Sequence, residues 1–183
     1  MKFLIFTILG SAAMLVALVG IFLSGDLKTF DMVLLSESAN RLVAGGMVLP
    51  ISMLFWLFFI AFAIKIPAWP VQTWLPDAHT DAPTAASVML AGVMLKMGGY
   101  GIIRICYPIC PEAAYDLAWV VCFIGVVSMV YGAFAALAQK DFKRMVAYSS
   151  VSHMGYVVLG LGVWSAVAPS FNADYWNCLL YTS

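Results

Sequence analysis

Five long apolar stretches constrain this 183-residue chain more than any other feature. They cover residues 3–23, 47–74, 83–105, 117–138 and 145–167. A helix needs about 20 mainly apolar residues to cross a bilayer, and each stretch reaches that length. Hydrophobic residues make up 64% of the chain and charged residues 10%, which is more apolar surface than a soluble core of this size can bury. The solvent for most of the chain is therefore lipid.

The apolar stretches are expected to be helices, because their residues do not alternate with the period of two that barrel strands require. We predict an all-α, polytopic membrane protein of about five transmembrane helices. The first stretch is longer than the apolar core of a signal peptide, which has about 7–15 residues, so we interpret it as a retained span. The basic cluster at residues 139–144 predicts a cytoplasmic loop. Counting back through the spans puts Lys2 on the same side and the loop at 26–41 on the other.

Charge and cysteine patterns argue against two classes of partner. Nine basic and nine acidic residues cancel, so there is no electrostatic footprint for nucleic acid. The cysteines lack the C-x-x-C spacing of iron–sulfur and zinc sites. We expect no metal in this chain and interpret the cysteines as packing residues: Cys106, Cys110, Cys122 and Cys178.

The second stretch is interrupted by prolines at positions 50, 67, 70 and 76. An interior proline removes a helical hydrogen bond and clashes with the preceding turn. Two of these prolines closely follow Lys65, which predicts a helix that breaks after Lys65 and resumes. In lipid, such a break survives only where the freed backbone groups face protein or water, and it commonly marks an ion site. The alternative, equally open from sequence, is a helix that ends at Lys65 with the side chain extending to the interface.

Lys96 lies near the middle of the third apolar stretch. A charged lysine at the bilayer centre costs about 2.5–3.5 kcal/mol on insertion scales. A lysine can avoid that cost by releasing its proton, which an arginine effectively cannot do. Gly92 and Gly99 are expected to leave room beside the amine, and Tyr100 offers a hydroxyl one turn away. We predict that Lys96 handles protons; the alternative is an ion pair that only joins two helices.

Polar side chains form a stripe on the fifth stretch, at helical spacing: Ser149, Ser152, His153 and Tyr156. A histidine titrates near physiological pH and shuttles protons between its ring nitrogens. The stripe therefore predicts a proton relay through His153. Hydrogen bonding between helices, which serine and histidine also provide, is the alternative.

A second histidine, His79, lies in the segment "WLPDAHTDAPT" between Asp77 and Asp81. We interpret this segment as a structural connection between helices rather than as a site. Asp81 is expected to act as the N-cap of the helix that begins near Pro83, because aspartate is favoured at that position and proline just inside the helix.

Two segments resemble a known family. They are "FAIKIPAWPVQTWLPDAHTDAPTAASVMLAGVMLKMGGYGIIRI", residues 62–105, and "FAALAQKDFKRMVAYSSVSHMGYVVLGLG", residues 134–162. In order and spacing they are similar to the antiporter-like membrane subunits of respiratory complex I. The similarity covers most of residues 1–168. The versions "LPDAHTDAPTAASV" and "MLKMGGYG" favour the M-type branch of the family over its L-type and N-type branches.

The resemblance implies a fold of two inverted repeats, each with a broken helix. It implies that Lys65 is the lysine of the broken helix, Lys96 the central relay lysine and His153 the histidine on the polar axis. The implied function is proton translocation in the membrane arm of NADH:quinone oxidoreductase, driven by electron transfer in other subunits. No cofactor is expected in this chain, because NADH, FMN, iron–sulfur clusters and quinone belong to the rest of the complex. The implied neighbours are the N-type and L-type subunits, in a bacterial cell membrane or the mitochondrial inner membrane.

Parts of the family pattern have no counterpart in this sequence. The glutamate that partners the broken-helix lysine matches no residue, and neither does the second broken helix with its charged residue. We therefore interpret the chain as a fragment, with residues 1–168 as the central part of the proton-translocating domain and 169–183 as a truncated or foreign tail. The alternatives are a subunit of a multisubunit sodium/proton antiporter, a subunit of a membrane-bound hydrogenase, and a non-catalytic membrane anchor.

Overall fold

The structure is a computed structural model that describes residues 2–24, 30–31, 34 and 50–167. Its regular secondary structure is helical throughout the described part, which confirms the predicted all-α class. The α-helices are α1 (Lys2–Ser24), α4 (Ile51–Lys65), α5 (Trp74–Asp81), α6 (Thr84–Met89), α7 (Leu95–Gly101), α8 (Tyr107–Ile109), α9 (Pro111–Asp116), α10 (Ala118–Leu137) and α11 (Phe142–Val167). Two π-helical segments, η1 (Leu90–Met94) and η2 (Ile102–Cys106), lie on either side of α7.

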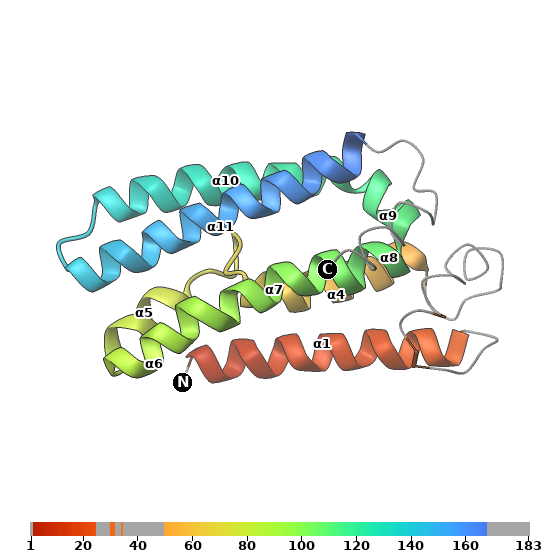
Figure 1. Ribbon diagram of the computed structural model, residues 1–183, viewed down its shortest axis with the longest axis horizontal. Coiled ribbons are helices and arrows are strands. Elements are labelled where there is room, and N and C mark those ends of the chain that lie inside the picture. The colour runs from red at the N-terminus through yellow and green to blue at the C-terminus, as the bar shows by residue number, and fades with distance from the viewer. Residues whose placement is uncertain (1, 25–29, 32–33, 35–49, 168–183) are drawn as a thin grey trace.

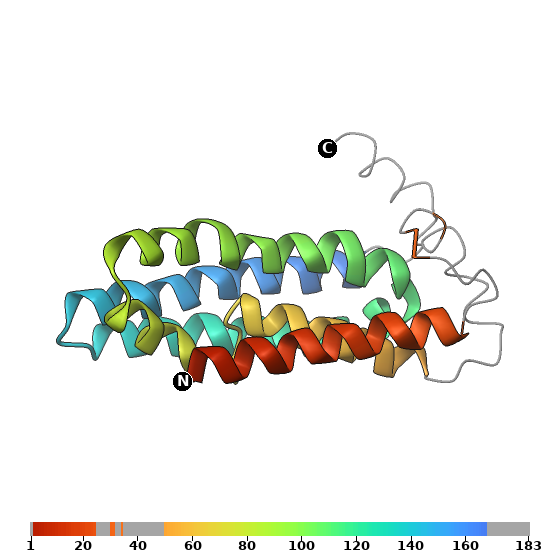
Figure 2. The ribbon, with the colours of Figure 1, turned by 90° about the horizontal axis from the view of Figure 1, so that it is seen from below.

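The long helices run side by side along the long axis of the molecule (Figures 1 and 2). Helices α10 and α11 form a hairpin on one side, and α1 packs against α4 on the other. In the described part of the chain, four helices are long and apolar enough to cross a membrane: Lys2–Leu23, Ala85–Ile109, Ala118–Leu137 and Phe142–Ala166. The second predicted span is represented by a shorter apolar helix, Ile51–Lys65, of 15 residues. The helix break after Lys65 explains why this element falls short of a full span.

Two local predictions are corrected by the structure. The segment around His79 is not a loop but the helix α5, and Asp81 is its last residue. The N-cap of α6 is Pro83, in an extended conformation and without a side-chain capping bond. Asp81 is therefore not an N-cap, because the chain stays helical through Asp81 and restarts only after the proline. The predictions for residues 26–41, apart from residues 30, 31 and 34, and for residues 169–183 lie outside the described residues.

Helical segments α6, η1, α7, η2 and α8 follow one another without a gap. The largest group of buried side chains joins α4 to α8, at the end of this series. Phe55 stacks on Phe59 with ring centroids 5.8 Å apart and on Tyr107 with centroids 6.4 Å apart. Cys106 and Cys110 are buried in the same cluster, as the packing interpretation of the cysteines predicts. These rings fix the position of α4, and through it the position of the break at its end.

Glycines seven residues apart bring α10 and α11 into backbone contact. A β-carbon at Gly132 would lie 2.7 Å from the backbone nitrogen of Ser152, and one at Gly125 would lie 2.6 Å from that of Leu159. Gly155 on α11 is equally close to the backbone of α10. Because lipid gives no hydrophobic drive for helix association, close packing across small residues supplies much of the stabilisation. The hairpin therefore depends on these glycines.

We predict that Gly132→Ala lowers the thermal unfolding midpoint of the full-length, detergent-purified protein. The added methyl meets backbone rather than a flexible side chain, so the expected cost is about 1–3 kcal/mol. Gly160→Ala is the matched control, because a β-carbon there has nothing within 4 Å. Alanine is also the better helix former, so the control should keep or raise the midpoint. Equal midpoints for the two variants would contradict the packing argument.

Candidate functional site

The break between α4 and α5 is the least regular part of the described membrane region. Helix α4 ends at Lys65 and α5 begins at Trp74, with turns between them. The indole nitrogen of Trp74 donates a hydrogen bond to the carbonyl oxygen of Ile64 at 2.9 Å, and this contact is buried. A carbonyl of the last helical turn, which has no partner within its own helix, is thereby satisfied from across the break.

A second hydrogen bond fixes the break against α10. The backbone nitrogen of Trp69 donates to the hydroxyl oxygen of Ser128 at 2.8 Å, and Ser128 is fully buried. Ile66 and Ala68 are also buried. The interruption thus lies within the protein, which favours a helix that breaks and resumes over a helix that ends at the membrane surface.

Helix α7 touches both α4 and α11 at adjacent glycines. A β-carbon at Gly98 would lie 3.1 Å from the backbone nitrogen of Ile66 and 3.1 Å from the carbonyl oxygen of Phe62. A β-carbon at Gly99 would lie 3.8 Å from a methyl carbon of Val157. These contacts bring together the helices that carry Lys65, Lys96 and His153.

The contacts also set the depth of the three predicted residues. Lys96 precedes Gly99 by three residues, or about 4.5 Å along the axis, and His153 precedes Val157 by four, or about 6 Å. Helices α7 and α11 run in the same direction (Figure 1), so the two side chains start at nearly equal depth. Lys65 lies one residue from the contact of α4 with α7. The structure therefore groups the three residues in one layer of the bundle, on three helices.

The surroundings of these residues differ. Lys65 is half-buried, whereas Lys96 and His153 are exposed on the described part of the chain. Within that part, none of the three forms an ion pair or a side-chain hydrogen bond. A structural ion pair for Lys96 thus finds no partner among the described residues.

The helix around Lys96 is less regular than the sequence suggests. The π-helical segments η1 and η2 bracket α7, which is seven residues long and carries Lys96. Such segments are rare and are frequent at functional sites. Gly92 lies in η1 with open space around it, and the room beside the Lys96 amine stays a prediction. The wider π turn, however, shifts it from the i−4 position of a regular helix.

The polar stripe on α11 is divided by the structure. Ser152 is buried, and its hydroxyl donates to the carbonyl oxygen of Met129 on α10 at 3.0 Å. His153 and Tyr156 are exposed on the described part. Ser152 therefore serves the hydrogen bonding between helices that was the alternative interpretation, and the interpretation of a single continuous stripe is wrong at this residue.

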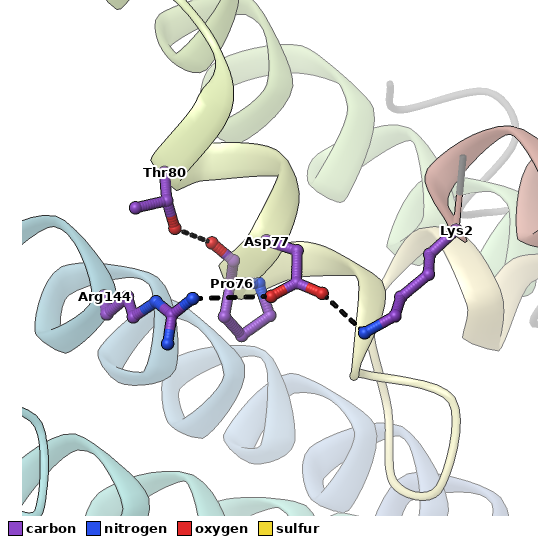
Figure 3. Close-up of polar contacts among 5 residues, drawn as sticks. All are labelled: Lys2, Pro76, Asp77, Thr80 and Arg144. Carbon is purple, nitrogen blue, oxygen red and sulfur yellow. Dashed lines mark hydrogen bonds and ion pairs between the residues drawn. The ribbon is translucent and has the colours of Figure 1, made fainter.

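A charged cluster ties the middle of α5 to α1 and α11 (Figure 3). Asp77 accepts a hydrogen bond from the Lys2 ammonium at 2.8 Å, and an Arg144 guanidinium nitrogen lies 3.8 Å from its other oxygen. In the same turn Thr80 donates to the carbonyl oxygen of Pro76. Because the charged groups are well exposed and solvent screens them, the pairs contribute little to stability. They do place Lys2 and the basic cluster at one end of the bundle, in agreement with the predicted topology.

His79 lies one turn beyond Pro76 and takes no part in the layer of Lys65, Lys96 and His153. Its Nε2 atom is buried without a hydrogen-bond partner among the described residues, and burial lowers the pKa of His79 below its ordinary value. The ring is thus favoured in its neutral form. The carbonyl oxygen of His79 accepts a hydrogen bond from Ser87 at 3.5 Å, which joins α5 to α6. This environment agrees with a structural role.

Several positions that shape the site were missed by the sequence analysis. The seven-residue spacing of the glycines on α10 and α11 is a readable signal of close helix packing. Ser128 gave no such signal, because a serine in an apolar helix does not reveal which backbone group will reach it. Among the described residues, no group of three or more histidine, cysteine, aspartate or glutamate side chains is placed to hold a metal ion.

Comparison with known proteins gives consistent matches. Residues 1–181 match the family described as "NADH:quinone oxidoreductase/Mrp antiporter, TM". The chain is 42% identical over 161 residues to NADH-quinone oxidoreductase subunit M of Rickettsia conorii, covering 88% of this chain and 31% of the relative. It is 46% identical over 167 residues to the subunit M of Rhodobacter capsulatus, covering 87% and 32%.

A chloroplastic relative and a solved structure also match the chain. The chain is 40% identical over 170 residues to the chloroplastic NAD(P)H-quinone oxidoreductase chain 4 of Mesostigma viride, covering 92% of this chain and 32% of the relative. It is also similar to a chain of respiratory complex I from Thermus thermophilus with bound NADH, with a TM-score of 0.68 and 34% identity, covering 88% and 33%. The chain thus spans about a third of the length of the relatives it matches.

We predict that Ser128→Ala destabilises the full-length, detergent-purified protein by about 1–3 kcal/mol, because the Trp69 backbone nitrogen loses its acceptor in a partly buried place. Ser150→Ala is the matched control, since the Ser150 hydroxyl bonds only to Val146 in its own helix. The control should change stability by no more than about 0.5 kcal/mol. Comparison of the two thermal unfolding midpoints tests the prediction, and an unchanged midpoint for Ser128→Ala would refute the anchoring role.

Proposed function

The chain belongs to the NADH:quinone oxidoreductase/Mrp antiporter transmembrane family, and on that premise we propose that it forms part of an M-type subunit that translocates protons. The proposed setting is the membrane arm of an NADH:quinone oxidoreductase. Residues 1–168 are the central part of its proton-translocating domain in this proposal. The relatives named subunit M support the assignment, and their length, about three times that of this chain, implies that the activity belongs to a longer subunit.

The observation that carries the proposal is the layer formed by Lys65, Lys96 and His153 beside a broken helix. Two of these groups are lysines and the third is a histidine, which are residue types that commonly serve as proton carriers. Ionisable residues inside a membrane are costly, and they commonly mark ion pathways and proton relays. Three of them at similar depth on neighbouring helices support a path across the bundle rather than along a single helix.

In this proposal, other subunits carry out the redox chemistry. Electron transfer from NADH through FMN and iron–sulfur clusters to quinone takes place in other subunits. The free energy released there moves protons through the layer of Lys65, Lys96 and His153. The likeness to a chain of a respiratory complex supports a place among other subunits of such a complex. We assign N-type and L-type membrane subunits as its neighbours.

A second candidate function is a subunit of a sodium/proton antiporter, because the family description includes the Mrp antiporters. The same layer of ionisable groups serves that exchange. The two functions differ in what drives proton movement. Proton uptake into vesicles that requires NADH and quinone supports the oxidoreductase, whereas uptake that requires only a sodium gradient supports the antiporter.

We predict that Lys65→Ala in the full-length subunit impairs proton pumping more than assembly. Lys65 is half-buried at the end of α4, so its removal interrupts the proposed path without opening a core cavity. The ratio of protons moved to quinone reduced is expected to fall by about tenfold or more, as is usual when an acid–base group is lost. Lys140→Ala, in the exposed turn before α11, is the control. A normal ratio in an assembled Lys65→Ala complex would remove Lys65 from the path.

We predict that Lys96→Arg assembles but loses most proton translocation. A relay needs a group that can release its proton, and an arginine effectively cannot. A structural ion pair, by contrast, needs only a permanent cation and would be preserved. Lys140→Arg controls for the chemical change. Quinone reductase activity and proton uptake are measured in vesicles for each variant, and wild-type pumping by Lys96→Arg would show that charge alone is required.

A further inference from the structure

The turn between α10 and α11, residues 138–141, lies beside two lysines that have no partner in the described part of the chain (Figure 1). Lys140 and Lys143 are exposed, and neither forms an ion pair or a side-chain hydrogen bond with a described residue. Arg144 differs from them, because its guanidinium lies 3.8 Å from a carboxylate oxygen of Asp77. Asp141 is the one acidic residue between Lys140 and Lys143, so the turn keeps a net positive charge.

Large apolar side chains border the two lysines on both sides. Leu137 at the end of α10 is 83% exposed, and Phe142 at the start of α11 is 74% exposed. Phe134, about one helical turn before Leu137, is 70% exposed. Contiguous apolar surface of this kind marks a contact with another molecule or with a membrane. The turn thus presents cations and apolar surface side by side.

The length of α10 places the turn at the surface of the membrane. Trp119, at the other end of this helix, is 79% exposed, and tryptophan is enriched at the boundary between lipid and water. The helix from Trp119 to Leu137 spans about 27 Å, close to the roughly 30 Å of a hydrocarbon core. With the indole at one boundary, Leu137 lies near the other. Lys140 and Lys143 are then at the level of the lipid headgroups.

The ligand that satisfies both features of the turn has a negative headgroup and long apolar chains. Phosphate oxygens accept hydrogen bonds from lysine ammonium groups, and basic residues just outside a membrane span attract anionic lipids. An acidic protein segment would pair with the lysines but would leave Leu137 and Phe142 uncovered. A zwitterionic lipid would cover the apolar side chains, but its own cation would oppose the two ammonium groups.

We propose that the turn between α10 and α11 is a binding site for an anionic phospholipid. Lys140 and Lys143 donate hydrogen bonds to the headgroup phosphate, and the acyl chains lie against Leu137, Phe142 and Phe134. Because the lipid contacts both helices of the hairpin, it binds the folded state and raises the unfolding midpoint.

The lipid site is separate from the proposed proton path. Lys143 precedes His153 by ten residues, which is about 15 Å along α11. The inference therefore goes beyond the proposed function and does not depend on it.

The site is tested with the full-length, detergent-purified subunit, titrated with phosphatidylglycerol or with phosphatidylcholine. Native mass spectrometry reports bound lipid, and the thermal unfolding midpoint reports stabilisation. The wild type is expected to bind phosphatidylglycerol more tightly than phosphatidylcholine, and added salt should weaken that preference. The double variant Lys140→Gln with Lys143→Gln is expected to lose about tenfold or more in affinity for phosphatidylglycerol, because two surface cations are removed. Its affinity for phosphatidylcholine should not change.

Asp141→Asn is the matched variant of opposite sign, because it removes the carboxylate between the two lysines. It should bind phosphatidylglycerol at least as tightly as the wild type. Equal affinity of the wild type and the double variant for phosphatidylglycerol would overturn the site, and so would a wild type without a preference between the two lipids.

A structure of the wild-type complex in phosphatidylglycerol nanodiscs tests the site without a substitution. Phosphate density is expected within hydrogen-bonding distance, about 2.7–3.2 Å, of the ammonium groups of Lys140 and Lys143. A protein segment that covers the turn in the complete complex would overturn the proposal. An uncovered turn without phosphate density would overturn it as well.

Discussion

The requirement that backbone polar groups find partners within the membrane shapes the whole structure. A helix satisfies these groups with hydrogen bonds inside its own segment, which is why most of the described chain is helical. Among the described residues, the stretch between Lys65 and Trp74 is the longest connection where helices do not meet this requirement. There the Trp74 indole caps the end of α4, and Ser128 on α10 accepts the Trp69 backbone nitrogen. A break of this kind needs other elements to be positioned around it before it can form.

The packing of the other helices can be understood as the support for that break. Ring stacking between α4 and Tyr107 fixes the start of the broken element. Glycine contacts bring α10 close to α11, and the Ser152 hydroxyl adds a hydrogen bond between their backbones. Since α10 also carries Ser128, the hairpin and the break are mechanically linked. A change in the packing of α10 and α11 is therefore expected to reach the residues beside Lys65.

The site contains three ionisable side chains that have no ion-pair partner among the described residues. Lys65, Lys96 and His153 lie in one layer, yet within the described residues none is held in an ion pair. A cation locked to a carboxylate is poorly suited to give up its proton, because the pair favours the charged form. The exposed Asp77 cluster shows the contrasting arrangement (Figure 3), with charges paired at the end of the bundle. The Asp77 pairs thus lie apart from the layer of Lys65, Lys96 and His153.

The sequence by itself determined the solvent, the number of apolar segments, the position of Lys96 within one of them and the prolines that end a helix after Lys65. Each of these follows from composition or from spacing along one segment, since lipid selects apolar runs and proline disrupts a helix locally. The sequence left open whether that helix resumes inside the protein. Only the tertiary structure decided that Ser152 faces α10 while His153 does not, that Gln72 is buried and that Asp77 meets Lys2. These features depend on which residues of distant segments approach one another. That approach is set by glycine contacts and side-chain shape across helices, which the periodicity of a single helix does not encode.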